Sequence, residues 1–535
     1  MMALKTIAIV MLAFVAHAEF TCSVSVGKAG SVGAVRDGTI AWKNTGTTEV
    51  AAPYVRLNAG DGVFVRFTET DQWTKSLEFL ATSSGAQASV LKGYEKGELT
   101  FLCKSSSDDD TMELSYTLAS AEAFPWADVE NSLKPSFVSD TAWVFALRTL
   151  KARLGSTWDS YLGRFRADVD YLAALGRPVN RMDRLWQFEI NRALGIDPAV
   201  PTLANSVDAA CSARGLGLTL SRSYSSAMYA RFNKGMFGSG WTDNLSVYAE
   251  WIEESKTLAF HIPGGGSYSF VKTVTPARIQ KINMTGTQAG DGTLPDVVTW
   301  TPEDTRDRTR VSETETSYVL TYQNGTKQTF AKANMRTASI ADSSGNQLTF
   351  TWNGTQLAEI AHTDGQFLTF AYANGLLASV TDDGGRQTTY AHANGLLTSV
   401  TSFDGLTTRY EYHPADGTIN ARALTRIVYP DGTTREFAYG EDGLVAALSA
   451  DGGKAKTTIA RREGEVAITG SDGSKTVMKT GVTGETYETK DALGGTSVSR
   501  YGADGDTWNR RIELYLLDCG VTAEEIAKFR SIMLQ

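Results

Sequence analysis

Cysteine and histidine are scarce in this sequence, and the few that occur form no recognisable site. There are four cysteines and five histidines in 535 residues, with no C-x-x-C and no H-E-x-x-H spacing. Because zinc sites favour such spacings, we predict no metal site. The stretch GLGLTL lacks the third glycine of a dinucleotide fingerprint, and there is no G-x-S-x-G turn. We therefore predict no cofactor, no catalytic residue and no enzymatic activity, although a carboxylate pair suited to glycoside hydrolysis stays open.

Positive charge and proline are also in short supply. Lys and Arg number 51 against 60 Asp and Glu, which gives a net charge of −9, and no basic cluster stands out. This balance argues against a nucleic-acid partner. Glycine (50) far outnumbers proline (12), which favours many tight turns and a mainly β fold. A chain of this length exceeds one ordinary core, so several domains are expected.

Long hydrophobic runs are missing except at the N-terminus. Residues 7–16 are apolar, Lys5 precedes them, and Ala16-His17-Ala18 follows. The run is shorter than the roughly 20 residues of a membrane span, and the small-x-small pattern predicts a signal peptide over 1–18 with cleavage after Ala18. No later segment is apolar enough to span a bilayer. We expect a mature chain without a membrane span that is secreted, periplasmic or at the cell surface.

Export permits disulfides. Cys22 and Cys103 stand at the two ends of one strand-rich region, so we predict a disulfide between them. Cys211 and Cys519 could pair only if the C-terminal tail returns to the middle of the chain. Two buried thiols remain the alternative for that second pair.

Two regions precede the main repeats. Residues 19–122 contain short apolar or alternating runs such as GTIAWKN and GVFVRFTE between turn clusters, which predicts a β-sandwich-like domain. Residues 123–200 predict a helical hairpin, because apolar residues recur three and four apart. Ser156 with Asp159 is typical of a capping box, and Gly195 of a helix C-cap. The two apolar stripes are Leu162, Phe165, Val169 and Leu172, then Met182, Trp186, Ile190 and Ala193.

A repeat dominates residues 321–452. Glycines recur at intervals of twenty and once more after a longer unit: Gly325, Gly345, Gly365, Gly385, Gly405 and Gly432. Aromatic residues stand five positions after each glycine, and a second aromatic residue follows seven positions after most of them. The structural aromatics are Phe330, Phe350, Trp352, Phe370, Tyr372, Tyr390, Tyr410, Tyr412, Phe437 and Tyr439. Positions two apart share one face of a strand, and Asn-Gly pairs such as Asn374-Gly375 favour hairpin turns. We predict hairpins that stack into a continuous sheet with these aromatics on one side.

Residues 201–320 hold a second, non-repeated motif. An apolar strand is followed by a glycine-punctuated turn, which lets the backbone pass close to another element. The motif residues are Arg222, Tyr224, Gly235, Phe237, Gly238, Gly240 and Trp241. This L-x-R-x-Y-x-S strand followed by G-x-F-G-x-G-W resembles the opening domain of the Rhs/YD-repeat family, which includes bacterial Rhs-type and teneurin-like YD-shell proteins. The stretches TTRYEYHPADG and LTRIVYPDGTTREFAYGEDGL resemble YD repeats, and the resemblance runs from about Leu218 to Gly452.

The resemblance implies hairpins coiled into a hollow β-shell that often encloses a C-terminal toxin or other passenger. The array is short for a closed shell, and no DPxG-type segment is found, so we expect a partial, open shell without a toxin tail. Residues 453–500 are aromatic-poor and predict degenerate repeats. Residues 501–535 predict a tail with a capping helix, since Thr522 and Glu525 form a capping-box pattern.

Three functions fit these features. The first is a secreted, non-enzymatic YD-repeat protein serving as a surface, scaffold or interaction module for another protein. The second is a carbohydrate-binding surface protein that holds a cell-surface polysaccharide on exposed aromatic rings. The third is a truncated fragment of a polymorphic toxin shell that lacks its effector.

Overall fold

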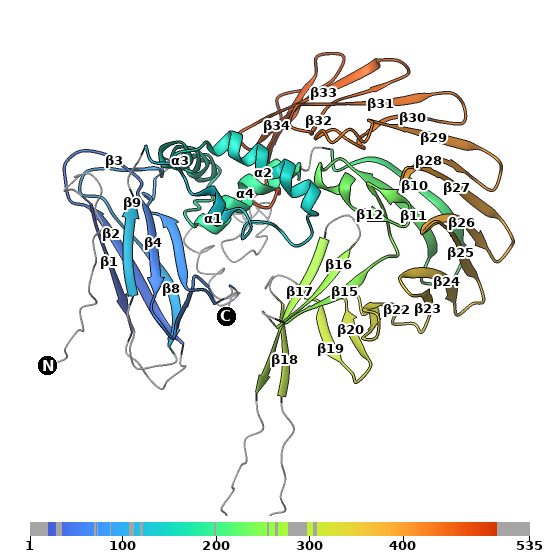
Figure 1. The fold of residues 1–535 in the computed structure, drawn as a ribbon, viewed down its shortest axis with the longest axis horizontal. Coiled ribbons are helices and arrows are strands. Elements are labelled where there is room, and N and C mark those ends of the chain that lie inside the picture. The colour runs from blue at the N-terminus through green and yellow to red at the C-terminus, as the bar shows by residue number, and fades with distance from the viewer. Residues whose placement is uncertain are drawn as a thin grey trace, which may run out of the picture.

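The structure is a computed structural model that describes residues 20–499 with short gaps at 28–34, 69–70, 72, 86, 106–111, 118–120, 197–199, 254–255, 263–265, 276–296 and 303–307. The predicted signal peptide with its cleavage site after Ala18 lies outside the described residues. So do Cys519 and the predicted capping helix. The described part is mainly β, with a two-sheet domain, a helical region and one large curved sheet (Figure 1).

The N-terminal region is a β-sandwich, as predicted. Its strands alternate buried and exposed residues, and Ile40, Val55 and Phe79 meet between the two sheets in one hydrophobic core. One sheet has the order β1 (Phe20–Val26), β2 (Arg36–Asn44), β8 (Lys96–Ser105), β5 (Val63–Arg66). The other has the order β6 (Ser76–Leu80), β4 (Tyr54–Ala59), β9 (Met112–Thr117), and a short pair is formed by β3 (Val50–Ala51) and β7 (Val90–Leu91).

The predicted disulfide between Cys22 and Cys103 is wrong. The two cysteines lie on β1 and β8, which flank β2 on opposite sides, and they stand opposite Trp42 and Arg36 respectively. Six residues along β2 separate those two partners, or about 20 Å at the rise of a strand. Disulfide geometry requires Cα atoms within about 7 Å. Burial instead raises the pKa of the Cys22 thiol to about 12.

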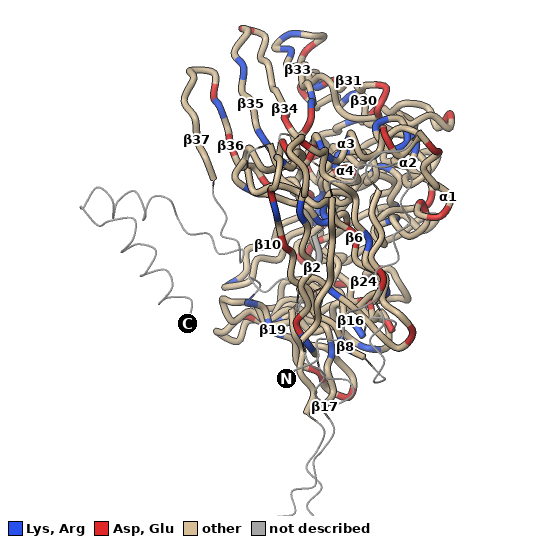
Figure 2. Tube along the Cα trace, turned by 90° about the vertical axis from the view of Figure 1, so that its left-hand side faces the viewer, with Lys and Arg blue, Asp and Glu red and all other residues tan. Residues whose placement is uncertain are grey.

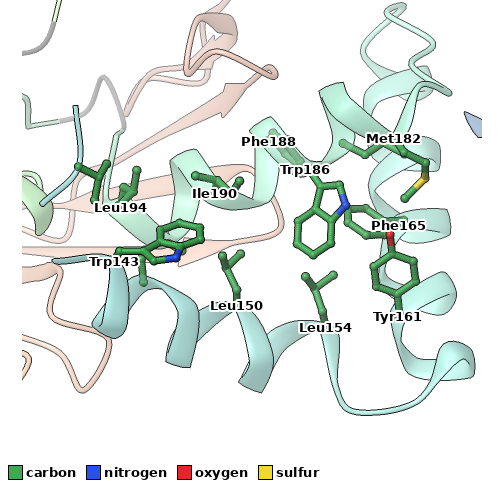
Figure 3. Packing of buried hydrophobic residues seen from close by; sticks show 14 of the residues in the cluster. Trp143, Leu150, Leu154, Tyr161, Phe165, Met182, Trp186, Phe188, Ile190 and Leu194 are labelled. Atoms are coloured by element: carbon green, nitrogen blue, oxygen red, sulfur yellow. The ribbon is translucent and has the colours of Figure 1, made fainter. Parts of the chain in front are cut away.

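The helical region contains more than the predicted hairpin. The described residues form α1 (Trp126–Val129), α2 (Asp140–Leu154), α3 (Trp158–Ala174) and α4 (Met182–Leu194). Helices α3 and α4 were predicted, but α2 was not. Its buried side chains Trp143, Leu150 and Leu154 point toward α4, with Trp143 on the side of Ile190 and Leu154 beneath Trp186 (Figure 3). These aromatic and aliphatic side chains build one shared core.

The helix ends show one correction. Helix α3 begins after Thr157, whose extended backbone lets its hydroxyl accept from the Ser160 amide, and Ser160 bonds back to complete the capping box. The predicted pair of Ser156 and Asp159 is therefore displaced by one residue. Gly195 ends α4 in the left-handed conformation (φ 76°), as a C-cap glycine does.

Between the helices and the large sheet lie the short strands β10 (Thr202–Cys211), β11 (Leu218–Ser225), β12 (Lys234–Gly235), β13 (Gly238–Ser239) and β14 (Trp241–Asp243), with the 3₁₀ turn η1 (Tyr229–Phe232). β10, β11 and β14 pair as one small sheet, and β12 pairs with β13.

The large sheet joins 23 strands of the described chain in strict sequence order, each antiparallel to the next where their pairing is recorded. They are β15 (Tyr248–Ile252), β16 (Thr257–Ile262), β17 (Gly266–Thr275), β18 (Val297–Pro302), β19 (Arg310–Glu313), β20 (Ser317–Thr321), β21 (Lys327–Ala331), β22 (Arg336–Ala341), β23 (Gln347–Asn353), β24 (Gln356–His362), β25 (Phe367–Ala373), β26 (Leu376–Asp382), β27 (Gln387–Ala393), β28 (Leu396–Thr401), β29 (Thr407–Tyr412), β30 (Leu424–Val428), β31 (Thr434–Tyr439), β32 (Val445–Ala450), β33 (Lys454–Arg462), β34 (Glu465–Thr469), β35 (Lys475–Thr480), β36 (Thr486–Lys490) and β37 (Thr496–Val498). The sheet remains open, and β15 touches β22 at the pair Tyr248 and Arg336.

A repeated β-bulge accompanies the curvature of the sheet. In the hairpin of β25 and β26, Ala371 pairs with Ser379 but Tyr372 pairs with Leu377, so Ala378 is left as an extra residue. The same shift recurs at the equivalent point of four other repeat hairpins, and in the hairpin of β21 and β22 it lies two residues earlier, between Thr329 and Phe330. Bulges bend a strand and increase its twist. Their repetition explains why the hairpins arc around the inner strands and helices in Figure 1 instead of forming a flat sheet.

Charged residues of both signs are interspersed along the chain. Figure 2 shows Lys and Arg among Asp and Glu, without a large patch of one sign on the face in view. Among the described residues, the helices are too short or too polar to cross a membrane.

Candidate functional site

Residues 202–243, which we call the inner segment, lie on the concave side of the large sheet (Figure 1). Leu218, Leu220 and Tyr224 of β11 share one hydrophobic core with the inward side chains of the repeats. The chain therefore fills the concave side with its own residues. The predicted Rhs-type motif lies within this segment.

Except for Phe330, the repeat aromatics share a core with the inner segment. Those five positions after the glycines are at most 8% exposed: Phe330, Phe350, Phe370, Tyr390, Tyr410 and Phe437. Those seven positions after are partly buried against the same core: Trp352, Tyr372, Tyr412 and Tyr439. Phe330 belongs to a separate core near the start of the sheet. The repeat glycines Gly325, Gly345, Gly365, Gly385, Gly405 and Gly432 all have positive φ and close the turns.

The second aromatic of each repeat also ties neighbouring hairpins together. Trp352 Nε1 donates to the Thr337 carbonyl, and the Tyr412 hydroxyl donates to the Leu397 carbonyl, both at 2.7 Å. In each case the acceptor stands 15 residues earlier in the chain. The polar tip of a half-buried ring is thus satisfied by backbone of the preceding unit.

The glycine-rich turn of the motif passes directly against the sheet. The Ser239 amide donates to the Gly395 carbonyl at 3.0 Å, and the Phe237 ring lies 5.1 Å from that of Tyr390. A Cβ on Gly238 would stand 2.5 Å from the Gly395 oxygen, and Gly238 has φ +92°. Only glycine allows both this backbone conformation and this approach.

A buried ion pair links the inner segment to two hairpins. Arg222 Nε lies 2.7 Å from Asp208 Oδ2, and both side chains are 2% exposed. The other side of the guanidinium donates to the Tyr410 hydroxyl at 2.8 Å, and the Tyr390 hydroxyl donates to Asp208 at 3.1 Å. Burial alone would lower the pKa of Arg222, but Asp208 and Tyr410 raise it. The guanidinium also lies 4.6 Å from the Trp241 ring.

Tyr224 and Trp241 complete this contact. The Tyr224 hydroxyl donates to the Arg422 carbonyl at 3.1 Å and accepts from the Leu424 amide at 3.2 Å. Trp241 Nε1 donates to the Tyr412 hydroxyl at 2.9 Å. These hydrogen bonds hold the inner segment against the sheet.

The helices hold the later, degenerate hairpins in the same way. The Tyr171 hydroxyl donates to the Gly464 carbonyl at 2.9 Å and accepts from the Thr480 amide at 3.0 Å. Asn191 Nδ2 donates to the Val482 carbonyl at 3.0 Å. Helices α3 and α4 therefore line the concave side where the inner segment ends.

Two buried carboxyl groups lie within the helical region. Glu189 is fully buried among Arg153, Arg164 and Arg192, which hold its pKa low against the effect of burial. Burial and the neighbouring Glu189 raise the pKa of Asp168 well above its usual range. The cluster joins α2, α3 and α4, which is a structural use of charge.

Cys211 lies beside two carboxylates but makes a poor metal site. Its Sγ stands 3.7 Å from Asp383 Oδ1, and Asp382 is the third possible ligand. Burial and both carboxylates raise the pKa of the thiol, whereas metals bind the thiolate. Asp382 is already engaged by the Gly384 amide and by Arg386.

One large cavity lies between the helical region, the inner segment and the first part of the sheet. Its volume is about 1240 Å³, and Phe137, Tyr229, Asp243, Tyr248 and Trp352 are among its lining residues. The lining combines aromatic rings with hydroxyl, amide and charged groups. Residues of all three parts meet around this space.

Planar side chains are layered along one wall of this cavity. The His261 ring stacks on the Tyr248 ring at 4.7 Å, with an interplanar angle of 23°. The Arg336 guanidinium lies 5.1 Å from the Tyr248 ring and 5.7 Å from the Trp352 ring. Buried Asp243 lies near this wall, and its Oδ1 accepts from the Leu245 and Ser246 amides at 2.8 and 2.6 Å. Burial raises the pKa of Asp243.

Comparison with known proteins identifies the repeat. The RHS-repeat family model matches residues 372–407, which span one full hairpin and its neighbours. Residues 372–407 therefore contain an RHS repeat. No curated protein matches the chain.

Two solved structures are similar to parts of this chain. A porin-like protein from Bacteroides uniformis is 14% identical over 53% of this chain and 98% of its own, with a TM-score of 0.16. The TcdB2-TccC3 structure is 11% identical over 51% of this chain and 19% of its own, with a TM-score of 0.18. TM-scores this low do not establish a shared overall fold.

Several residues that matter for these contacts were not predicted from the sequence. Asp208, the partner of Arg222, lies in a strand that showed no motif. Arg336 is the first residue of β22 and had no unusual neighbours in sequence. The small residue Ala378 and its equivalents mark the bulges, and their recurrence two positions before the paired valine or isoleucine was the signal available.

Proposed function

We propose that this RHS-repeat chain is a secreted, non-enzymatic scaffold or interaction protein. The observation that carries the proposal is the filled concave side. The inner segment and the helices occupy the space that a hollow shell would offer to a passenger. A chain built in this way has its outer face and rims left for contacts with other molecules.

The polar groups of the motif support a structural role. Arg222, Asp208, Tyr390 and Tyr410 bond to one another beneath the sheet. A catalytic group must reach a substrate, whereas these side chains are almost fully buried. Their chemistry fixes the curvature and the position of the inner segment.

Protease digestion tests whether the concave side has room for a passenger segment. An unstructured peptide joined after Gln535 is expected to be cleaved by protease as fast as the same peptide on an unrelated carrier, because the concave side is full. The control is the uncleaved RHS-repeat core, which should remain intact. Protection of the peptide while the core is folded would contradict the proposal.

Export has a separate test. The chain expressed in a bacterium with its own N-terminus should appear outside the cytoplasm, and its mass should correspond to a start at Glu19. An intact N-terminus on protein that stays in the cytoplasm would contradict export.

Carbohydrate binding on the repeat aromatics is not favoured. Those rings would have to be exposed and coplanar, but Phe350, Phe370 and Tyr390 are at most 8% exposed beneath the inner segment. A glycan cannot stack on rings that are already covered.

A further inference from the structure

A second cavity lies where the helices meet the later hairpins. Its volume is about 510 Å³, and residues of α2, of the end of α4 and of the turn between β33 and β34 line it. Small or apolar side chains form part of the lining: Ala152, Ala193, Ile196, Ile419, Leu444 and Val466. The space is therefore suited to a few apolar side chains of an incoming segment.

We propose that this second cavity receives the C-terminal segment 521–535 of the same chain, with Ile526, Phe529 and Met533 against the apolar lining. The segment lies outside the described residues. Its docking fastens the last hairpins to α2 and α4, which goes beyond the scaffold function and does not depend on it. The argument rests on where the described chain ends, on the apolar pattern of the segment and on the charges of the two walls.

The described chain ends on the helix side of the sheet. The Ser499 amide donates to the Tyr487 carbonyl at 2.7 Å, and Arg177, which follows α3, donates to the Tyr487 hydroxyl at 2.9 Å. Strand β37 lies three strands beyond β34 in the sheet order, which is about 15 Å at the usual strand spacing. Residues 500–520 span up to about 70 Å when extended, so the segment can reach the cavity.

The apolar residues of the segment fall on one side of a helix. Ile526, Phe529 and Met533 stand three and four positions apart, and this spacing places side chains on one face. The sequence predicts a helix here, and such a helix needs a surface on which to bury its stripe. The cavity offers that surface within reach of the chain.

The helix wall of the cavity carries positive charge. It presents three guanidinium groups and, among the described residues, no carboxylate: Arg148, Arg153 and Arg192. Glu189 binds Arg153 and Arg192 from within the helical region, whereas Arg148 forms no ion pair within 4.0 Å among the described residues. Burial and the neighbouring Arg153 lower the pKa of Arg192 to about 10, against the effect of Glu189. A further carboxylate at this wall is therefore favourable.

The hairpin wall of the cavity carries most of the negative charge. Its carboxylates come from two turns: Glu441, Asp442, Glu463 and Glu465. Arg461 and Arg462 also line this side, and Arg461 donates to the Val445 carbonyl at 2.6 Å. The two walls thus differ in charge, and a matching segment has a carboxylate along one edge and a cation along the other.

Segment 521–535 has this arrangement. At about 100° per residue, Glu525 and Arg530 flank the apolar stripe by about 70° on opposite sides. One orientation of the helix places Glu525 toward the helix wall and Arg530 toward the carboxylates of the hairpin wall. Lys528 then lies on the outward side.

The test measures the accessibility of a thiol in the cavity of the full chain. Thr149→Cys puts the thiol in the lining, and Val144→Cys puts it at a 56% exposed position of α2 outside the lining. Both carry Cys519→Ser, and the other three cysteines are at least half-buried. The rate of labelling by a neutral, bulky maleimide is followed by the shift in mass.

The tail variants are Phe529→Asp and Arg530→Glu, with Lys528→Glu as the matched control for charge. Phe529→Asp should speed labelling at position 149 about tenfold or more, because a buried apolar side chain is lost. Arg530→Glu should speed it about twofold to fivefold, as expected for ion pairs near the surface. Lys528→Glu should leave it unchanged, and none of the three should alter labelling at position 144.

Far-UV circular dichroism and the urea midpoint show that each variant is folded. An unchanged rate at position 149 in folded Phe529→Asp would overturn the proposal, as would equal acceleration by Lys528→Glu and Arg530→Glu. Light scattering and labelling at several protein concentrations distinguish docking by a second copy. Dimers whose labelling at position 149 speeds up on dilution would overturn docking within one chain.

Discussion

Replacement of Gly238 by alanine tests whether the inner segment is packed tightly against the sheet. A new Cβ would stand 2.5 Å from the Gly395 carbonyl oxygen, and the backbone has φ +92°. Holding an alanine at this positive φ alone lowers the free energy of unfolding by about 1–2 kcal/mol. Displacing the turn also removes the bond from the Ser239 amide to Gly395, about 1 kcal/mol.

The neighbouring ring pair of Phe237 and Tyr390 adds about 0.5–1.5 kcal/mol if it separates. We therefore expect Gly238→Ala to lower the free energy of unfolding by about 2.5–4.5 kcal/mol.

Gly345→Ala is the matched control. Gly345 has φ +90°, but no atom lies within 4 Å of its Cβ position, so only the backbone term of about 1–2 kcal/mol applies. Both variants are measured by urea denaturation with tryptophan fluorescence, with a separate transition allowed for the N-terminal sandwich. Equal losses for the two variants would refute the close contact between the inner segment and the sheet.

Three other predictions concern the free energy of unfolding. Phe370→Ala should lower it by about 3–5 kcal/mol because the ring is buried. The control Phe403→Ala, at a 60% exposed position, should change it by less than about 0.5 kcal/mol in the same urea assay. Arg222→Met should lower the free energy of unfolding by about 3–5 kcal/mol because it leaves Asp208 buried and unpaired. The double variant Arg222→Met with Asp208→Leu should recover part of that loss. Absence of any recovery in the double variant would contradict a stabilising role for the ion pair. Burial lowers the pKa of His392 below 6.5, so the folded protein binds fewer protons there than the unfolded chain, and stability should fall as the pH drops below about 6.5. His392→Phe should flatten that slope in urea midpoints measured from pH 7.5 to 5, and an unchanged slope would contradict it.

The periodic part of the fold was predictable because its signals are local. Asn374 and Gly375 adopt φ +51° and +79°, as an Asn-Gly hairpin turn requires. Spacing of two residues placed Phe370 and Tyr372 on one side of the sheet. The bulge at Ala378 was not anticipated, because alternation alone does not reveal an extra residue in the returning strand.

What covers the concave side was not predictable from the pattern. Periodicity shows that a face is apolar but not which distant segment lies on it, and the contact of Gly238 with Gly395 joins residues 157 positions apart. The predicted disulfide between Cys22 and Cys103 failed for a similar reason. Two cysteines near the ends of one domain can lie on strands whose register keeps them far apart. The cavity depends on Arg336 and Asp243 meeting from separate elements, which no sequence spacing encodes.

Hydrogen exchange of residues 233–243 in the unmodified chain tests the central claim most directly. If the inner segment is a fixed part of the concave side, the amides of Ser239 and Gly240, which bond to Gly395 and Asn233, should exchange as slowly as amides of the repeat strands, and Gly238→Ala should accelerate them. Exchange of these amides within seconds, while the repeat strands stay protected, would contradict the account.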